Sequence, residues 1–208
     1  MIGRFIAVEG ADGTGKSTQA RLLAERLGAL FTREPGGTPL GEQIRDLVLD
    51  PAGEAPVDRA EALLMAAARA QHVDLVVAPA LAAGRDVVSD RYVASSIAYQ
   101  GHGRGLGAGS VAEVNEFATG GLAPDLVVLI EVAAPVAGSR LGEDREGELD
   151  RIEQAGDDLQ GVVADAYRAM AIADPDRWVI IDGDGTVDEV AARVAAMVDD
   201  WLNPRWDS

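Results

Sequence analysis

The amino-acid sequence predicts an α/β fold of three layers, with a mostly parallel sheet of about five strands between two layers of helices. Two observations lead to this prediction. Short apolar runs of strand length alternate along the chain with longer segments whose apolar residues have helical spacing. The short runs are apolar on both faces, which is typical of parallel strands buried between helices. With 208 residues, 48% of them hydrophobic, the chain is long enough for one core, and we expect a single domain over residues 1–208.

The expected strands are bounded by Gly, Asp or Pro. They lie at Phe5 to Val8, Asp86 to Ser89, Leu126 to Ile130 and Trp178 to Ile181, and a further strand ends in the segment Thr32 to Thr38. The expected helices lie between and after them, at Lys16 to Leu27, Leu40 to Leu49, Asp58 to about Val77, Val111 to Phe117, Asp157 to Ile172 and Val187 to Trp201. The glycine-rich segments Gly101 to Gly109 and Gly138 to Gly156 are predicted to be mobile loops.

The composition excludes several classes of function. A formal net charge of -17 would repel the phosphate backbone of nucleic acids, so we expect no nucleic-acid partner. The chain has no cysteine, which excludes disulfides, thiolate metal sites and cysteine nucleophiles. No run approaches the roughly 20 apolar residues of a membrane span, and no export signal precedes the first strand. We therefore expect a cytoplasmic protein without a membrane partner.

One motif carries a specific chemistry. The stretch from Gly10 to Ser17, GADGTGKS, matches the phosphate-binding pattern GxxxxGK[ST] and lies where that pattern requires, between the first strand and a helix. Its glycines let backbone N–H groups surround a phosphate, and the positive end of the helix dipole adds to their effect. Lys16 would reach the β- and γ-phosphates, and Ser17 would hold Mg²⁺. We therefore expect a P-loop NTPase fold with an ATP-binding loop, made of Gly10, Ala11, Asp12, Gly13, Thr14, Gly15, Lys16, Ser17 and Thr18.

Lys16 is the only lysine in the chain. A guanine-specific GTPase needs an Asn-Lys-x-Asp motif, and because the one lysine already lies in the phosphate loop, that class is excluded. A lysine suits such a loop because its ammonium is a slim point charge, whereas the planar fork of arginine suits bidentate partners.

Six segments resemble the bacterial thymidylate kinases, and together they span nearly the whole chain. They are FIAVEGADGTGKST (Phe5 to Thr18), TREPGGT (Thr32 to Thr38), AEALLMAAARAQH (Ala60 to His72), SDRYVASSIAYQGHGRG (Ser89 to Gly105), APDLVVLIEV (Ala123 to Val132) and GELDRIE (Gly147 to Glu153). The resemblance implies transfer of the γ-phosphoryl group of ATP to the 5′-phosphate of dTMP, with Mg²⁺. It also implies a homodimer, and a lid over ATP at about residues 138–156.

The resemblance implies roles for residues near the phosphates. Asp90 would hold Mg²⁺ together with Ser17, although a strand-end aspartate can instead cap the next helix. Arg91 would clamp the dTMP phosphate with its bidentate fork. Asp12 would contact the sugar 3′-hydroxyl or the region of the metal. Arg33 and Arg45 would face the acceptor phosphate.

Further residues are implied to surround the nucleoside. Arg69 and Ser96 match positions that read the thymine edge, with an exposed helix arginine as the alternative for Arg69. Tyr99 matches a tyrosine that excludes a 2′-hydroxyl, with an ordinary half-buried tyrosine as the alternative. Gln100 follows it in the same motif. The turn at Glu34 is implied to contain a cis peptide bond before Pro35, and Glu34 itself is expected at the substrate.

The chain departs from the family pattern at two places. Met65 stands where relatives commonly place a phenylalanine that stacks on the base, so base affinity or selectivity is open to change. Glu146 stands where bacterial relatives place a lid arginine. Arg145 is then the expected catalytic arginine of the lid, with Arg140 and Arg151 as the other candidates.

Two alternatives to a dTMP kinase stay open at this point. Met65 favours a kinase for another nucleoside or nucleoside monophosphate, and the acidic lid favours a nucleotide-binding protein without turnover. The histidines, His72 and His102, show no catalytic pattern, and we expect them on a helix surface or in a loop.

Overall fold

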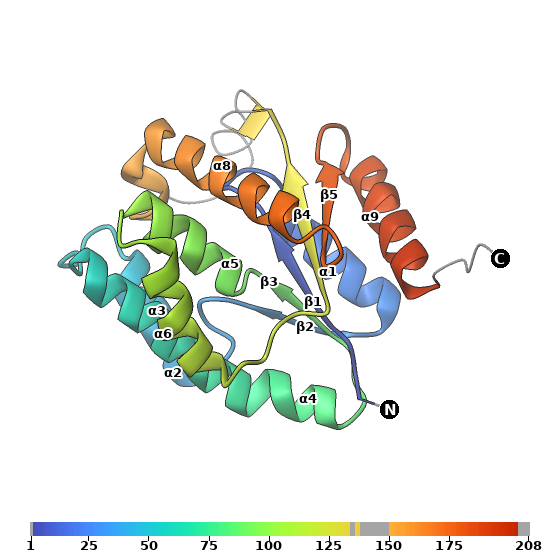
Figure 1. Ribbon diagram of the computed structural model, residues 1–208, viewed down its shortest axis with the longest axis horizontal. Coiled ribbons are helices and arrows are strands. Elements are labelled where there is room, and N and C mark those ends of the chain that lie inside the picture. Colours follow the sequence, from blue (N-terminus) through green and yellow to red (C-terminus); the bar gives the residue numbers. More distant parts are fainter. Residues whose placement is uncertain (1, 134–135, 138–149, 204–208) are drawn as a thin grey trace.

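The computed structural model describes residues 2–133, 136–137 and 150–203, and a five-stranded sheet forms its centre (Figure 1). The strands are β1 (Phe5–Glu9), β2 (Leu30–Arg33), β3 (Val87–Asp90), β4 (Leu126–Glu131) and β5 (Trp178–Asp182). They lie in the order β2-β3-β1-β4-β5, and each neighbouring pair is parallel. The predicted α/β class and the parallel sheet of five strands are confirmed.

Six helices of the described chain lie close to their predicted ranges, namely α1 (Lys16–Leu27), α2 (Pro39–Leu49), α3 (Asp58–His72), α6 (Ala108–Thr119), α8 (Asp157–Ala173) and α9 (Val187–Leu202). Two short helices, α4 (Ala78–Ala82) and α5 (Val93–Ser96), were not predicted. Three short segments have other helical pitches: the π-helical η1 (Val73–Val77) and η2 (Ile97–Gly103), and the 3₁₀ turn η3 (Glu153–Ala155).

One predicted loop is only partly correct. Gly101 and Gly103 belong to η2, and Gly109 lies in the first turn of α6, so within Gly101 to Gly109 only residues 104–107 form a loop. An added Cβ on Gly103 would lie 2.4 Å from the Leu159 side chain of α8, so this glycine allows a close approach of two helices. The other predicted loop, Gly138 to Gly156, falls mainly outside the residues that the structure describes.

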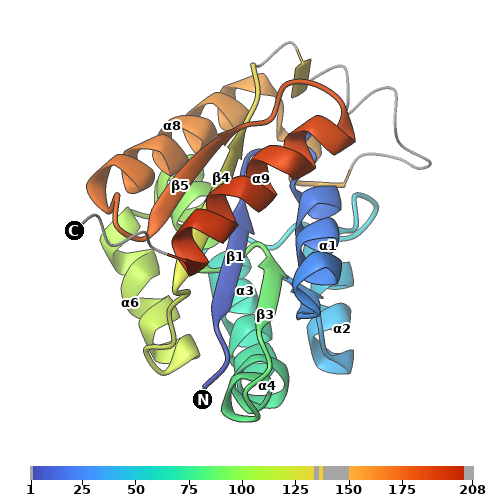
Figure 2. The same cartoon turned by 90° about the vertical axis from the view of Figure 1, so that its right-hand side faces the viewer.

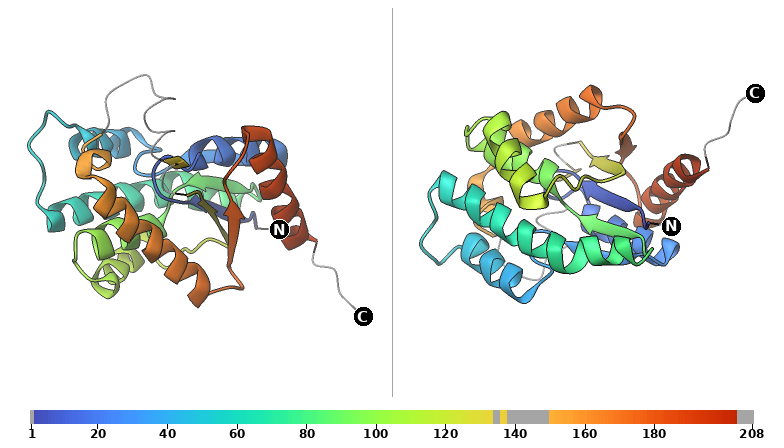
Figure 3. Two further views of the ribbon diagram at one scale, coloured as in Figure 1. Left: turned by 90° about the horizontal axis from the view of Figure 1, so that it is seen from above. Right: turned by 60° about the horizontal axis from the view of Figure 1, so that its bottom comes forward.

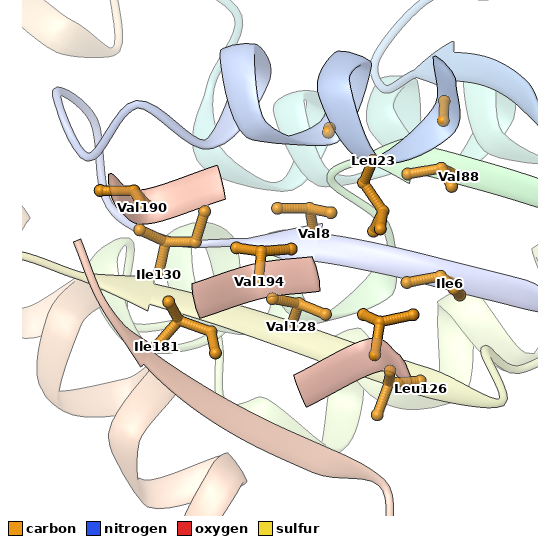
Figure 4. Close-up of a cluster of buried hydrophobic side chains, with 13 residues drawn as sticks. Ile6, Val8, Leu23, Val88, Leu126, Val128, Ile130, Ile181, Val190 and Val194 are labelled. Carbon is orange, nitrogen blue, oxygen red and sulfur yellow. The ribbon is translucent and has the colours of Figure 1, made fainter. Parts of the chain in front are cut away.

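Helices α1 and α9 pack side by side on one face of the sheet (Figures 2 and 3). Alternate residues of the strands point toward them, among them Val8 of β1 and Val128 of β4, which meet Leu23 of α1 and Val194 of α9 (Figure 4). These side chains are almost completely buried, and burying one such side chain contributes about 1.5–3 kcal/mol. The other face of the sheet, which includes Phe5, packs against the remaining helices.

The order of the strands places a crevice above the middle of the sheet. Strand β1 lies between β3 and β4, α1 follows β1 on one face, and α5 follows β3 on the other face. Because neighbouring strands lead to opposite faces, the loops at their carboxyl ends diverge, and ligands of open α/β sheets bind at such a point. Within the described parts of the chain, no helix is long and apolar enough to cross a membrane.

Candidate active site

A cavity of about 460 Å³ lies at the carboxyl ends of β1, β2 and β3. The described residues that the sequence assigned to substrate or metal line it together, namely Asp12, Lys16, Ser17, Arg33, Glu34, Arg45, Met65, Arg69, Asp90, Arg91, Ser96, Tyr99 and Gln100. They come from three strand ends and from α1, α2, α3, α5 and η2. The structure therefore brings these predicted residues into one cavity.

The phosphate loop has the geometry that its glycines permit. Gly13 and Gly15 have φ of 78° and 81°, in the left-handed region that residues with a side chain rarely adopt. An added Cβ on Gly10 would lie 2.6 Å from the Ile130 carbonyl oxygen, so a larger residue does not fit there. Lys16 is the first residue of α1 and is buried, while Ser17 and Thr18 lie exposed in the same turn. Thr14 closes the loop by donating from its hydroxyl to the Ala11 carbonyl, at 3.0 Å.

Asp12 contacts both Lys16 and Arg91 in the cavity. Its carboxylate accepts from Lys16 Nζ at 3.3 Å, from the Tyr99 hydroxyl at 2.8 Å, from Gln160 Nε2 at 3.0 Å, and from Arg91 Nη2. Burial favours the neutral form of Asp12, but the positive charges of Arg91 and Lys16 outweigh it and hold the pKa of this carboxyl far below its usual range. Asp12 is therefore an anion that holds two cations side by side.

Burial and the nearby charge of Arg91 lower the pKa of Lys16, and Asp12 acts against this shift. Phosphate oxygens would act in the same direction as Asp12, because an opposite charge favours the ammonium form. The buried Lys16 is thus a group whose surroundings favour a bound anion.

Arg91 follows β3 directly and has φ of 71°, a backbone conformation that costs of order 1–3 kcal/mol for a residue other than glycine. Its Nη1 donates to the Gly10 carbonyl at 3.3 Å, to Ser95 Oγ at 3.0 Å and to the Tyr167 hydroxyl at 3.2 Å. Its guanidinium also lies 5.0 Å from the centre of the Tyr99 ring. These contacts fix the side chain at the mouth of the P-loop.

Arg69 is buried at 4% exposure, which excludes the alternative of an exposed helix arginine. Its Nε donates to Glu34 Oε2 at 2.6 Å, Nη1 donates to Ser96 Oγ at 2.9 Å and to Asn115 Oδ1, and Nη2 donates to the Tyr92 carbonyl at 3.1 Å. Most of its donors are thus used within the protein, and its place in the cavity wall is fixed.

The expectation for His72 is wrong, because its side chain is fully buried at the end of α3. Nδ1 lies 2.8 Å from Glu34 Oε1, and Nε2 lies 2.6 Å from Thr32 Oγ1. His72 therefore supports Glu34 from the side opposite Arg69, and it does not line the cavity. His102 lies within η2 and is exposed.

The end of the cavity beside β2 and α2 combines basic and apolar groups. Arg33 pairs with Glu42 at 2.7 Å, and Arg45 Nη1 donates to the Pro35 carbonyl at 3.1 Å. The peptide bond between Glu34 and Pro35 is cis, as expected. Met65 is buried in the cavity wall, and the side-chain amide of Gln100 donates to Glu61 at 2.9 Å.

The sequence model of the family described as thymidylate kinase matches residues 8–194. The chain belongs to the thymidylate kinase family. The thymidylate kinase of Lactobacillus helveticus is 42% identical over 205 residues, which cover 96% of this chain and 97% of that protein. That of Cereibacter sphaeroides is 48% identical over 208 residues, which cover 96% of each. A crystal structure of thymidylate kinase from Ehrlichia chaffeensis matches with a TM-score of 0.77 at 27% identity, covering 95% of this chain and all 100% of that one.

The residues of this thymidylate kinase family member fit a magnesium ion. Asp90 is buried, and its Oδ1 has no hydrogen-bond partner within residues 2–133, 136–137 and 150–203. Ser17 lines the same cavity. In that part of the chain no group of three or more His, Cys, Asp or Glu side chains could hold a metal. The one carboxylate of Asp90 and the one hydroxyl of Ser17 suit Mg²⁺, which commonly takes one or two protein oxygens and completes its shell with water and substrate phosphate.

The lid candidates are only partly described. Arg140 and Arg145 lie outside the described residues. Arg151 donates from Nε to the Val48 carbonyl at 2.8 Å and lies 3.6 Å from Glu61, and it is not among the residues that line the cavity. Its guanidinium is thus engaged with α2 and α3.

Several residues at the site were missed in the sequence. Gln160 of α8 contacts Asp12 twice, since its Oε1 also accepts from the Asp12 backbone N–H at 3.3 Å. Asn115 of α6 contacts Arg69, and Tyr167 of α8 contacts Arg91. No motif marks these positions, because they reach the site only through the packing of α6 and α8.

Proposed function

We propose that the chain transfers the γ-phosphoryl group of ATP to a 5′-phosphate oxygen of dTMP, giving dTDP and ADP for dTTP synthesis, with residues 1–208 as one catalytic domain. The observation that carries the proposal is the position of Asp12, which pairs with Lys16 of the P-loop and with Arg91 at the end of β3. A point-charge cation and a forked cation thus lie together in one cavity. Each suits one of two adjoining phosphates.

In this reaction the acceptor phosphate is itself the nucleophile, so the protein has to align two polyanions and neutralise their charge. Lys16 and the backbone N–H groups of Gly13 to Lys16 bind the β- and γ-phosphates of ATP. Arg91 binds the dTMP phosphate through its fork, and Arg33 and Arg45 add positive charge at the same end of the cavity. The fixed contacts of Arg91 mean that little reorganisation is needed when charge develops.

The nucleoside of dTMP lies against the remaining wall. Arg69, Ser96 and Gln100 offer polar groups to the thymine edge, and Met65 packs on the ring face. The Tyr99 ring takes the space that a 2′-hydroxyl would need. Asp12 accepts from the sugar 3′-hydroxyl, and Glu34 holds Arg69 in place.

The proposed cofactor is Mg²⁺, held by Asp90 and Ser17, and it neutralises charge on the β- and γ-phosphates when bound. The proposed lid, at about residues 138–156, supplies Arg145 to the transferred phosphoryl group.

The proposal is tested by a coupled ADP-release assay over dTMP, dUMP, dCMP, dGMP, AMP and thymidine, with Lys16→Ala as the inactive control. We expect turnover with dTMP, and none with thymidine because it lacks the acceptor phosphate. A different preferred monophosphate would favour the alternative that Met65 raised, and no ADP release with any acceptor would favour a binding protein. Neither alternative finds support in the family assignment.

We further propose a cytoplasmic homodimer whose interface includes α3 and α6. These helices pack on each other and expose Leu63 at 58% and Phe117 at 92%. Light scattering should give twice the 21.7 kDa of one chain. Phe117→Ser should shift the mass toward one chain, and the matched variant Ile172→Ser, which changes an exposed residue of α8, should leave it unchanged. A single-chain mass for the unaltered protein would refute the dimer.

A further inference from the structure

Glu9 is a charged residue that the phosphoryl-transfer scheme does not use. It ends β1, directly before the P-loop, and its side chain is fully buried at 0% exposure in a strand that is otherwise apolar. It does not line the cavity. Removing a carboxylate from water costs free energy unless partners compensate, so its contacts have to explain its presence.

The contacts of Glu9 all lead to Arg91. Oε2 accepts from Ser95 Oγ at 2.7 Å and from the Tyr167 hydroxyl at 3.0 Å. The same two hydroxyl oxygens accept from Arg91 Nη1, at 3.0 Å and 3.2 Å. Two hydroxyl bridges therefore join the Glu9 carboxylate to the Arg91 guanidinium.

Glu9 also holds the backbone next to Arg91. Its Oε1 accepts from the backbone N–H of Tyr92 at 2.8 Å. Arg91 itself has φ of 71°, and such a conformation persists only where the surroundings over-determine it. One buried carboxylate thus restrains both the strained backbone and the head group of the same arginine.

The charges around Arg91 have separate tasks. Asp12 contacts the guanidinium from inside the cavity, where a bound nucleotide would compete for the same cations. Glu9 lies behind the guanidinium, outside the cavity, so ligands do not compete with it. Its attraction for Arg91 remains when phosphate binds at the front.

We propose that Glu9 is a positioning residue for Arg91, acting through Ser95 and Tyr167 to hold the guanidinium in the geometry that binds the acceptor phosphate. The inference rests on the proposed function, because it takes Arg91 to be the clamp on dTMP. An ordinary structural carboxylate would stabilise the fold without a specific effect on the acceptor.

The test compares Glu9→Gln with the unaltered protein in steady-state kinetics. We expect kcat/KM for dTMP to fall about 10- to 100-fold, as is typical when outer hydrogen-bond partners of metal ligands are removed. KM for ATP should stay near its original value, because Lys16 does not contact Glu9. The control is Asp86→Asn, which removes a carboxylate that pairs with Arg4 at the amino ends of the strands, away from the cavity, and should leave kcat/KM unchanged. An equal rise of KM for both substrates, or no change at all, would overturn the role.

A second variant keeps the carboxylate and breaks one bridge. Tyr167→Phe removes the hydroxyl of a residue that does not line the cavity. It should lower kcat/KM for dTMP, but by a smaller factor than Glu9→Gln does. This variant stands in for Glu9→Gln if that protein fails to fold. Unchanged kinetics of a folded Tyr167→Phe protein would then overturn the proposal.

The dissociation constant of dTMP, measured by calorimetry, supplies the remaining evidence. If Glu9 acts through Arg91, Glu9→Gln should weaken dTMP binding when it is the only substitution. In a protein that already carries Arg91→Ala, it should weaken dTMP binding no further. An equal loss of dTMP affinity with and without Arg91→Ala would overturn the positioning role. A protein that neither binds nor phosphorylates dTMP before any substitution would instead refute the proposed function, so the two failures are distinct.

Discussion

Replacing Arg69 by methionine removes one partner of a buried ion pair. The variant should unfold at a markedly lower denaturant concentration than the unaltered protein. Arg69 and Glu34 side chains are 4% and 3% exposed, and Arg69 supplies a donor to each of four groups. Removing one charge of such a pair costs about 3–5 kcal/mol because the other stays buried. At about 2–4 °C per kcal/mol for a chain of this size, the melting temperature should fall by about 6–20 °C.

The assay is urea unfolding followed by circular dichroism, with Arg4→Met as the matched control. Arg4 pairs with Asp86 at 2.6 Å, but its side chain is 45% exposed, and an exposed pair contributes about 0–1 kcal/mol. The control should therefore unfold close to the unaltered protein. If Arg69→Met and Arg4→Met lowered the free energy of unfolding by the same small amount, the ion pair with Glu34 would not hold Arg69. The assigned contacts would then be wrong.

The remaining predictions concern four other positions. Lys16→Arg should abolish ADP release without loss of helix content, because the planar fork does not fit the P-loop; retained turnover would contradict this. Arg145→Ala should lower turnover by about 10³-fold or more with little change in the dTMP KM, and unchanged turnover would remove it from the lid role. Met65→Phe should lower the dTMP KM by about 2- to 10-fold through aromatic stacking, and a raised KM would place the base elsewhere. Burial raises the pKa of Glu9 above 4.5, so the folded state holds this proton more tightly than the unfolded chain, and stability falls as the pH rises from 4.5 through the folded-state pKa. In thermal melts over this pH range, the stability of Glu9→Gln should not show that fall. Parallel plots of melting temperature against pH for the two proteins would exclude this effect of Glu9.

Local signals were sufficient for the elements that carry their own boundaries. Helix α1 runs from Lys16 to Leu27 as predicted, because Gly15 precedes it and Gly28 ends it, both in the left-handed conformation. The helical stretch Gly101 to Gly103 was missed for the opposite reason. Its glycines look like loop residues, but Gly103 is needed for the approach of Leu159, which only the packed structure reveals.

The candidate site could be predicted where chain order alone brings residues together. The P-loop, Glu34 and Arg91 follow three parallel strands, so their convergence at one edge of the sheet follows from the fold. Gln160 and Tyr167 come from α8, which packs on η2 and β5, and a single sequence contains no record of that contact. Glu9 did leave a signal, since it is a charged residue in an apolar strand that is buried in the fold.

The position of β1 also has a consequence for folding during synthesis of the chain. Among the described strands β1 is synthesised before the others, yet it is the middle strand of the sheet, where Phe5 pairs with Val87 and Ile6 with Leu126. At usual rates of translation the second partner follows on the order of ten seconds after the first strand. During that interval an apolar strand has no neighbour, and it is open to chaperones or to wrong pairing. The P-loop, which follows β1 directly, therefore acquires its final shape only after β4 has been made.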